Sequence, residues 1–145
     1  MRIFLTGKPG IGKTTLIKAI IDQYGSLCDG FYTEEIKVGR SRVGFSLKII
    51  NSKNCVPLAM SDGSVKIGPK VGKYTVNVKE MEAILPDAFP PTPAKIRIID
   101  EIGKMELLSQ KVTRLITDQI DNCEAILICT IPLNSTHRLV KGNGR

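Results

Sequence analysis

The sequence has little of what several classes of protein need. It holds one histidine, no tryptophan and 5% aromatic residues, and its four cysteines contain no C-x-x-C pair. A zinc site or a disulfide framework is therefore not expected, and neither is a serine hydrolase, whose chemistry would rest on His137 alone. The cysteines are instead expected to be reduced, buried thiols of a cytoplasmic protein; they are Cys28, Cys55, Cys123 and Cys129.

Long hydrophobic runs are also missing. No apolar stretch approaches the roughly 18 residues of a membrane-spanning helix, and the first segment, MRIFLTGKPG, reaches glycine and proline too early for a signal peptide. We therefore expect no membrane partner. With 145 residues, of which 42% are hydrophobic and 24% charged, the chain is long and apolar enough to fold as one globular domain.

Basic charge is present but unevenly distributed. The formal net charge is +7, yet residues 36–79 alone hold nine lysines and arginines against one acid, Asp62. That stretch carries +8, so the rest of the chain sums to −1. A local excess of this kind attracts polyanions, which leaves a nucleic-acid partner open.

Apolar patterns predict the secondary structure. Residues 86–93, with four prolines, are expected to form a loop. The order of elements is typical of an α/β fold with a mainly parallel sheet flanked by helices. We interpret the β-rich stretch 30–78 as a hairpin-rich insertion that extends this sheet within a single domain, 1–145. Strands are expected at 2–7, 30–36, 43–51, 55–60, 74–78, 96–100 and 125–131, and helices at 14–24, 79–85 and 107–120.

One motif carries a specific chemistry. The segment GKPGIGKT matches G-x-x-x-x-G-K-[ST] in full, and it stands between a predicted strand and a predicted helix. Its glycines allow successive backbone N–H groups to converge on phosphate oxygens. Lys13 is expected to reach the β- and γ-phosphates, and the Thr14 hydroxyl to bind Mg²⁺. The nucleotide-binding residues predicted here are Gly7, Lys8, Pro9, Gly10, Ile11, Gly12, Lys13, Thr14 and Thr15.

Two acids form the second part of the predicted site. Asp100 ends a buried strand, where Mg²⁺ prefers a carboxylate oxygen close to the phosphates. Glu101 follows directly and is suited to polarise an attacking water. The competing interpretation is an acidic cap at a helix N-terminus before Gly103.

Several further residues have both a functional and an ordinary interpretation. Thr130, at the end of the last predicted strand, either senses the γ-phosphate and holds the water, or is structural. Lys104 either meets a phosphate or is solvated. Glu34 and Glu35 either face the site or end a solvated strand. In the tail, Arg138, Lys141 and Arg145 either supply a charge-neutralising group at the transition state or form a basic tail.

Six segments occur in an order that resembles a known family. They are FLTGKPGIGKTTLIKAI, DGFYTEEI, RVGFSLKII, VGKYTVNV, IIDEIGKMELLS and CTIP, and together they span roughly residues 1–141. They resemble the small P-loop nucleoside-triphosphatases of archaea, thermophilic bacteria and animals, which include the cancer-related nucleoside-triphosphatase. The resemblance implies a fold related to RecA and AAA+ ATPases. It also implies Mg²⁺-dependent hydrolysis of ATP, GTP and other nucleoside triphosphates, with loose base preference.

The resemblance also assigns residues. It implies that Asp100 is the metal acid and Glu101 the catalytic glutamate, acting together with Lys13. Members of the family usually continue beyond the position of Arg145 with a strand and a helix. The chain is therefore expected to be a fragment or a shortened form, which weakens the functional interpretation of the tail arginines. The segment implied to line the nucleotide site comprises Ile98, Ile99, Asp100, Glu101, Ile102, Gly103, Lys104 and Met105.

Other functions remain open at this stage. The same loop serves small-molecule and polynucleotide kinases, although the adjacent Asp100 and Glu101 favour hydrolysis. A nucleotide-dependent, RNA-associated protein is a third hypothesis. A guanine-reading N-K-x-D motif is absent, which argues against a GTPase switch. We expect a monomer that accepts ATP, GTP, CTP and UTP, with the basic stretch 36–79 either flanking the nucleotide mouth or binding a second anion.

Overall fold

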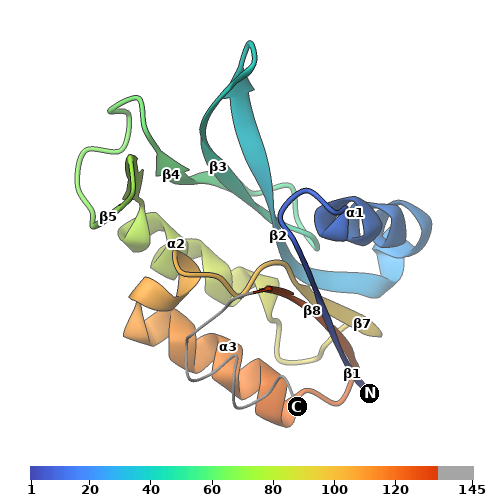
Figure 1. Cartoon of the computed structure of the whole chain (residues 1–145). Coiled ribbons are helices and arrows are strands. Elements are labelled where there is room, and N and C mark those ends of the chain that lie inside the picture. The colour runs from blue at the N-terminus through green and yellow to red at the C-terminus, as the bar shows by residue number, and fades with distance from the viewer. Residues whose placement is uncertain (134–145) are drawn as a thin grey trace.

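The structure, a computed structural model, describes residues 1–133 of the chain. One twisted sheet of eight strands runs through the molecule, and helices cover both of its faces (Figure 1). The strand order is β1-β8-β7-β2-β3-β4-β6-β5. The expected α/β architecture is confirmed, and the stretch 30–78 extends the same sheet, as predicted.

The elements follow the predicted order, with short 3₁₀ turns between some of them. No helix within residues 1–133 is long and apolar enough to cross a membrane. The elements are β1 (Arg2–Gly7), α1 (Lys13–Tyr24), η1 (Gly25–Leu27), β2 (Cys28–Val38), β3 (Ser41–Ile49), β4 (Cys55–Met60), β5 (Lys70–Val71), β6 (Tyr74–Val76), α2 (Val78–Ile84), η2 (Leu85–Ala88), β7 (Ile96–Ile99), η3 (Glu106–Leu108), α3 (Gln110–Asn122) and β8 (Ile126–Pro132).

The sheet has a parallel half and an antiparallel half, which meet at β2. Strands β1, β8, β7 and β2 run parallel to their neighbours, and β3, β4, β6 and β5 add antiparallel pairs. The long strand β2 pairs with β7 through its first residues and with β3 over Phe31–Val38. The hairpin β2–β3 therefore projects beyond the carboxyl end of β7.

Both faces of the parallel half are buried, which explains the apolar runs in its strands. On one face, Ile98 and Ile128 pack with Ile17 of α1. On the other face, Ile99 packs in the larger core, to which α2 and α3 contribute and which includes Ile116. Successive side chains of β7 and β8 thus point into different cores, so neither strand shows a polar alternation.

A few boundaries and environments differ from the sequence predictions. Helix α3 begins at Gln110 rather than at 107, because the Ser109 hydroxyl caps it by accepting a hydrogen bond from the Val112 N–H at 3.1 Å. The residues before it form η3 instead. Strand β7 ends at Ile99, one residue before Asp100. The expectation of buried thiols is wrong for Cys55, which is exposed at the start of β4, and Cys123 is only partly buried.

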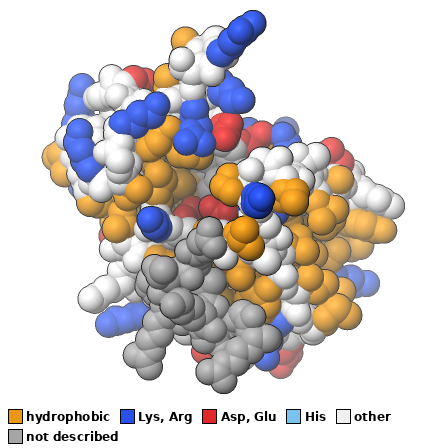
Figure 2. Space-filling view, viewed as in Figure 1, with side chains coloured by type: hydrophobic (Ala, Val, Ile, Leu, Met, Phe, Trp, Pro, Cys, Tyr) orange, Lys and Arg blue, Asp and Glu red, His pale blue; other side chains and the backbone are white. Residues whose placement is uncertain are grey.

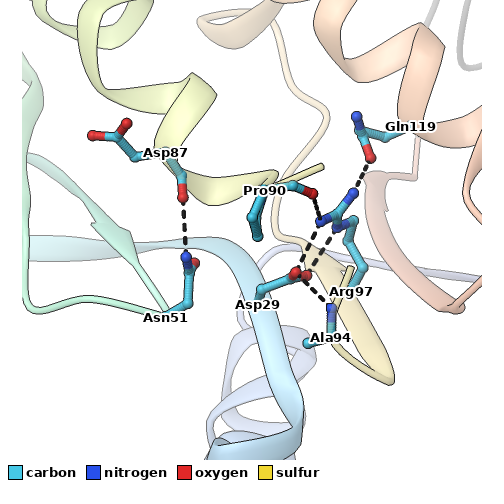
Figure 3. A network of polar contacts seen from close by, with 7 residues as sticks. All are labelled: Asp29, Asn51, Asp87, Pro90, Ala94, Arg97 and Gln119. Atoms are coloured by element: carbon cyan, nitrogen blue, oxygen red, sulfur yellow. Dashed lines mark hydrogen bonds and ion pairs between the residues drawn. The ribbon is translucent and has the colours of Figure 1, made fainter. Parts of the chain in front are cut away.

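A buried ion pair joins β2 to β7, two adjacent inner strands of the sheet (Figure 3). Asp29 and Arg97 are Cα partners in the register and are 1% and 4% exposed. The Arg97 guanidinium donates to both Asp29 oxygens, at 2.9 and 2.8 Å, and also to the Pro90 carbonyl and the Gln119 side chain. The Ala94 N–H donates to the same carboxylate. The pair also ties the proline-rich loop and α3 to the sheet.

Removing one partner of this pair should be costly. In Arg97→Met the Asp29 carboxylate stays buried without its counter-charge, so we expect the free energy of unfolding to fall by about 3–5 kcal/mol. The double variant Asp29→Leu/Arg97→Met leaves no unpaired buried charge, so its free energy of unfolding should fall much less. Urea unfolding measures both. The control Lys37→Met breaks an exposed pair and should cost at most about 1 kcal/mol. A loss below about 1 kcal/mol in Arg97→Met would contradict this role of the pair.

Candidate active site

The glycine-rich loop stands between β1 and α1, as predicted. Gly10 and Gly12 adopt φ values of 81° and 109°, in the left-handed region that favours glycine. Gly12 is also the N-cap of α1 and has no side chain to occupy the helix end. A Cβ on Gly7 would lie 2.8 Å from the Ile11 side chain, which covers that residue. The loop therefore presents its backbone and the positive end of α1 to an anion.

Lys13 and Thr14 begin α1 on the same cleft. The Lys13 ammonium donates to the Gly7 carbonyl at 2.6 Å and so stays beside the loop backbone. The cleft has a volume of about 1170 Å³, which is large enough for a nucleotide. The predicted loop residues that line it are Gly7, Lys8, Pro9, Gly10, Gly12, Lys13, Thr14 and Thr15; Ile11 is not among them.

Asp100 connects three segments that are far apart in the sequence. One carboxylate oxygen accepts a hydrogen bond from the Thr14 hydroxyl at 3.1 Å, and the other accepts from Thr130 on β8. The Asp100 N–H donates to the Phe31 carbonyl on β2 at 3.1 Å. Burial raises the pKa of Asp100, while the two hydroxyls and Lys13 oppose this change. A carboxylate beside a hydroxyl is an oxygen donor set that fits Mg²⁺.

Glu101 lines the cleft together with Lys13. Burial raises the pKa of its carboxyl group, the neighbouring Asp100 charge adds to the rise, and Lys13 opposes it. A carboxylate whose pKa moves toward neutrality becomes a better acceptor for the proton of a water. Glu101 therefore lies in the cleft and holds a proton more tightly than a fully solvated glutamate would.

Glu106 is a buried acid that the sequence predictions missed. It lies in η3, is 4% exposed, and accepts a hydrogen bond from the Gly103 N–H at 3.2 Å. A Cβ on Gly103 would lie 3.1 Å from both the Glu101 and Glu106 carboxyl oxygens, so this glycine separates two acids. Burial raises the pKa of Glu106 to about 8, and the charges of Glu101 and Asp100 add to the rise. The sequence does contain a signal of this burial, because Glu106 stands between apolar residues in the segment KMELL.

The remaining predicted site residues divide into two groups. Within the segment 98–105, only Glu101 lines the cleft. The expectation that the whole segment does so is corrected for the side chains of Ile98, Ile99 and Ile102, which are fully buried. Ile98 and Ile99 belong to β7, which is covered on both faces, and Ile102 packs in the same core as Ile99. Met105 packs against the core, and Lys104 is exposed outside the cleft. The tail residues Arg138, Lys141 and Arg145 lie outside the described part of the chain.

Glu34 and Glu35 face the cleft rather than solvent alone. Glu34 pairs with Lys18 of α1 at 2.6 Å and with Lys48 of β3 at 2.8 Å, and hydrogen bonds from these lysines lower its pKa. Glu35 pairs with Lys37 and Arg42 of the hairpin. In Figure 2, acidic side chains lie in the central hollow, below the basic side chains that gather on the hairpin side.

This arrangement defines a class of protein. A strand, a glycine-rich loop and a helix that begins with Lys-Thr, set against a strand-end aspartate, form the nucleotide site of P-loop proteins. Comparison with known proteins identifies the family within this class. The family model described as NTPase matches residues 2–143, so the chain belongs to the NTPase family.

Individual relatives agree with this assignment. The nucleoside-triphosphatase THEP1 of Aquifex aeolicus is 37% identical over 97% of this chain and 83% of the relative. The human cancer-related nucleoside-triphosphatase is 35% identical over 90% of this chain and 75% of the relative. The crystal structure of THEP1 from Aquifex aeolicus superposes with a TM-score of 0.83 and covers 100% of this chain and 84% of that one, at 33% identity.

Glu106 should make stability depend on pH. A folded-state pKa near 8, above the unfolded value of about 4.5, means that the native state holds the proton more tightly. The contribution of Glu106 to stability is therefore lost as pH rises from about 4.5 to about 8. Glu106→Gln should raise stability relative to the native sequence more at pH 8 than at pH 5. Urea unfolding at the two pH values measures this difference.

The control for this prediction is Glu124→Gln, which changes the same charge at an exposed position. Its effect on the free energy of unfolding should be small at both pH values. An effect of Glu106→Gln that is equal at pH 5 and pH 8 would contradict the assigned protonation of this residue.

Proposed function

We propose that this chain hydrolyses nucleoside triphosphates to nucleoside diphosphate and inorganic phosphate in a Mg²⁺-dependent reaction. The observation that carries the proposal is the Asp100 carboxylate, which accepts hydrogen bonds from Thr14 and Thr130 while Glu101, the next residue, lines the same cleft as Lys13. Membership of the NTPase family and relatives named nucleoside-triphosphatases support the same activity.

The proposed metal site uses the Thr14 hydroxyl and the Asp100 carboxylate. When bound there, Mg²⁺ would neutralise charge on the β- and γ-phosphates. Thr130 holds the second oxygen of Asp100 and so keeps the carboxylate turned toward Thr14. Support comes from the donor set, because a carboxylate and a hydroxyl supply the hard oxygen ligands that Mg²⁺ prefers.

The remaining steps belong to Lys13, Glu101 and the loop backbone. The loop N–H groups and the N-terminus of α1 bind phosphate oxygens, and Lys13 neutralises charge on the transferring phosphoryl group. Glu101 orients the attacking water and accepts its proton as the oxygen bonds to the γ-phosphorus. The diphosphate leaves with the electron pair of the broken P–O bond.

The proposed substrates are ATP, GTP, CTP and UTP, with loose base preference. The names of the relatives specify a nucleoside triphosphate without a base, which agrees with this range. The kinase hypothesis is not favoured, because a water-activating glutamate next to the metal acid serves hydrolysis. We also propose a cytoplasmic monomer. All four cysteines are free, as a reducing compartment requires.

Replacing Glu101 should separate binding from turnover. Glu101→Gln keeps the size of the side chain but removes the proton acceptor, so kcat should fall at least about tenfold while nucleotide affinity stays nearly unchanged. Phosphate release is measured with each of the four nucleoside triphosphates, with Mg²⁺ and with a chelator. Glu80→Gln, exposed on α2, is the control. Turnover of Glu101→Gln equal to that of the native sequence would refute the role of Glu101.

Replacing Lys13 should weaken binding itself. Lys13→Ala removes a charge that faces the phosphates, and we expect the Kd for a nucleoside triphosphate to rise at least about tenfold in calorimetry. The control is Lys104→Ala, which removes an exposed lysine near the site but outside the cleft and should change Kd less than about twofold. Unchanged affinity in Lys13→Ala would be incompatible with the proposed phosphate site.

A further inference from the structure

Arg42 is a cation of the hairpin β2–β3 that lines the same cleft as Lys13 and Glu101. Its side chain is held on several sides. Nε donates to the Tyr74 hydroxyl at 2.9 Å, and Nη1 donates to Glu35 at 3.2 Å. The guanidinium carbon lies 4.9 Å from the centroid of the Phe45 ring and 5.7 Å from that of Tyr74. Arg42 is thus positioned before any substrate binds.

The neighbouring cations of the hairpin are not held in this way. The Lys37 side chain is 58% exposed, and within residues 1–133 its one ion pair is with Glu35, at 3.5 Å. Arg40 belongs to the turn between the strands and does not line the cleft. In Arg42, only Nε and Nη1 have hydrogen-bond partners among residues 1–133, so Nη2 is available to a ligand. Arg42 therefore has both a fixed position and a spare hydrogen-bond donor, a combination that the single nitrogen of a lysine does not provide.

The sheet order puts Arg42 on a particular side of the substrate. The phosphate loop follows β1, the metal acid follows β7, and β2 and β3 come next beyond β7. In the proposed reaction, a triphosphate held by the loop directs its terminal phosphate toward Asp100 and Glu101. Glu35 of β2 and Phe45 of β3 both contact the guanidinium and are register partners. Glu35 lies two residues beyond Thr33, and the Thr33 backbone lies beside Asp100. Two residues of strand span about 7 Å, so Arg42 approaches from the γ-phosphate end.

The charges on this wall favour an anion. Glu34 is engaged by Lys18 and Lys48, and Glu35 is engaged by Lys37 and Arg42. Of these groups, Lys18, Lys37 and Arg42 line the cleft together with Glu34 and Glu35, so this wall keeps an excess of one positive charge. A terminal phosphate can therefore take up a donor of Arg42 without leaving a carboxylate unpaired, because Lys37 remains beside Glu35.

We propose that Arg42 is a catalytic residue that donates hydrogen bonds to the γ-phosphate oxygens and stabilises their charge in the transition state. This inference rests on the proposed function. In the step, a water oxygen bonds to the γ-phosphorus, the water proton passes to Glu101, and the bond to the β–γ bridging oxygen breaks with its electron pair on the diphosphate. Arg42 keeps its proton throughout. A positioned arginine at this place in a phosphoryl transfer accelerates the reaction by orders of magnitude.

The test compares Arg42→Ala with Arg40→Ala, which also removes one arginine of the hairpin but lies in the turn, outside the cleft. We expect Arg42→Ala to lower kcat at least about tenfold and Arg40→Ala less than about twofold. The Kd for nucleoside diphosphate, which lacks the γ-phosphate, should stay within about twofold in both. Arg42→Lys keeps the charge but not the fork and should recover only part of kcat.

A second readout excludes a merely structural role. Aluminium fluoride together with nucleoside diphosphate and Mg²⁺ mimics the transferring phosphoryl group, and the native sequence should retain the trapped diphosphate. Arg42→Ala should lose this trapping while it still binds diphosphate alone. Should Arg42→Ala lower Tm by several degrees, Arg42→Gln, which retains the first three carbons of the side chain, carries the same expected results.

Two outcomes would overturn the proposal. A kcat of Arg42→Ala within twofold of the native value, with trapping retained, would remove Arg42 from catalysis and leave the proposed hydrolysis intact. Absence of Mg²⁺-dependent phosphate release by the native sequence would instead refute the proposed function and, with it, the role of Arg42.

Discussion

The register between β2 and β7 is the constraint on which the rest of the structure depends. The buried pair Asp29–Arg97 joins the two strands at one residue level, and this register puts Phe31 beside Ile99. The Phe31 carbonyl then receives the Asp100 N–H, which holds the aspartate at the carboxyl edge of the sheet. A slip by one residue would turn the apolar side chains of β7 to the wrong faces and move Asp100 away from Thr14.

Around Asp100, the structure concentrates acids that water would normally solvate. Asp100 and Glu101 lie in the loop after β7, Glu106 lies in η3, which follows that loop, and burial raises the pKa of each. Lys13 is the cation that opposes this rise at Asp100 and Glu101, whereas Glu106 has a backbone N–H as its partner. Acids whose pKa values are raised by burial and by neighbouring charges are typical of functional sites.

Much of the fold could be read from the sequence, because its strongest patterns are local. The loop GKPGIGKT lies between β1 and α1, and the strands near 96–100 and 125–131 were found within a residue or two. The local patterns gave wrong predictions where a tertiary contact sets an element boundary or the burial of a side chain. The start of α3 depends on the Ser109 cap, and the side chains of Ile98, Ile99 and Ile102 are buried in the hydrophobic cores instead of lining the cleft. Glu106 was missed because its burial depends on how η3 folds back onto the loop.

The sequence by itself determined the phosphate loop, the Asp100–Glu101 pair and the α/β class, since each depends on neighbouring residues and on backbone preferences of glycine and apolar side chains. Only the tertiary structure decided what forms the opposite wall of the cleft. Arg42, Phe45 and Glu35 belong to it because β3 pairs with β2 beyond the end of β7, and Tyr74 reaches Arg42 from β6 through the same sheet. Strand pairing between distant segments sets those contacts, and no local pattern of residues encodes it.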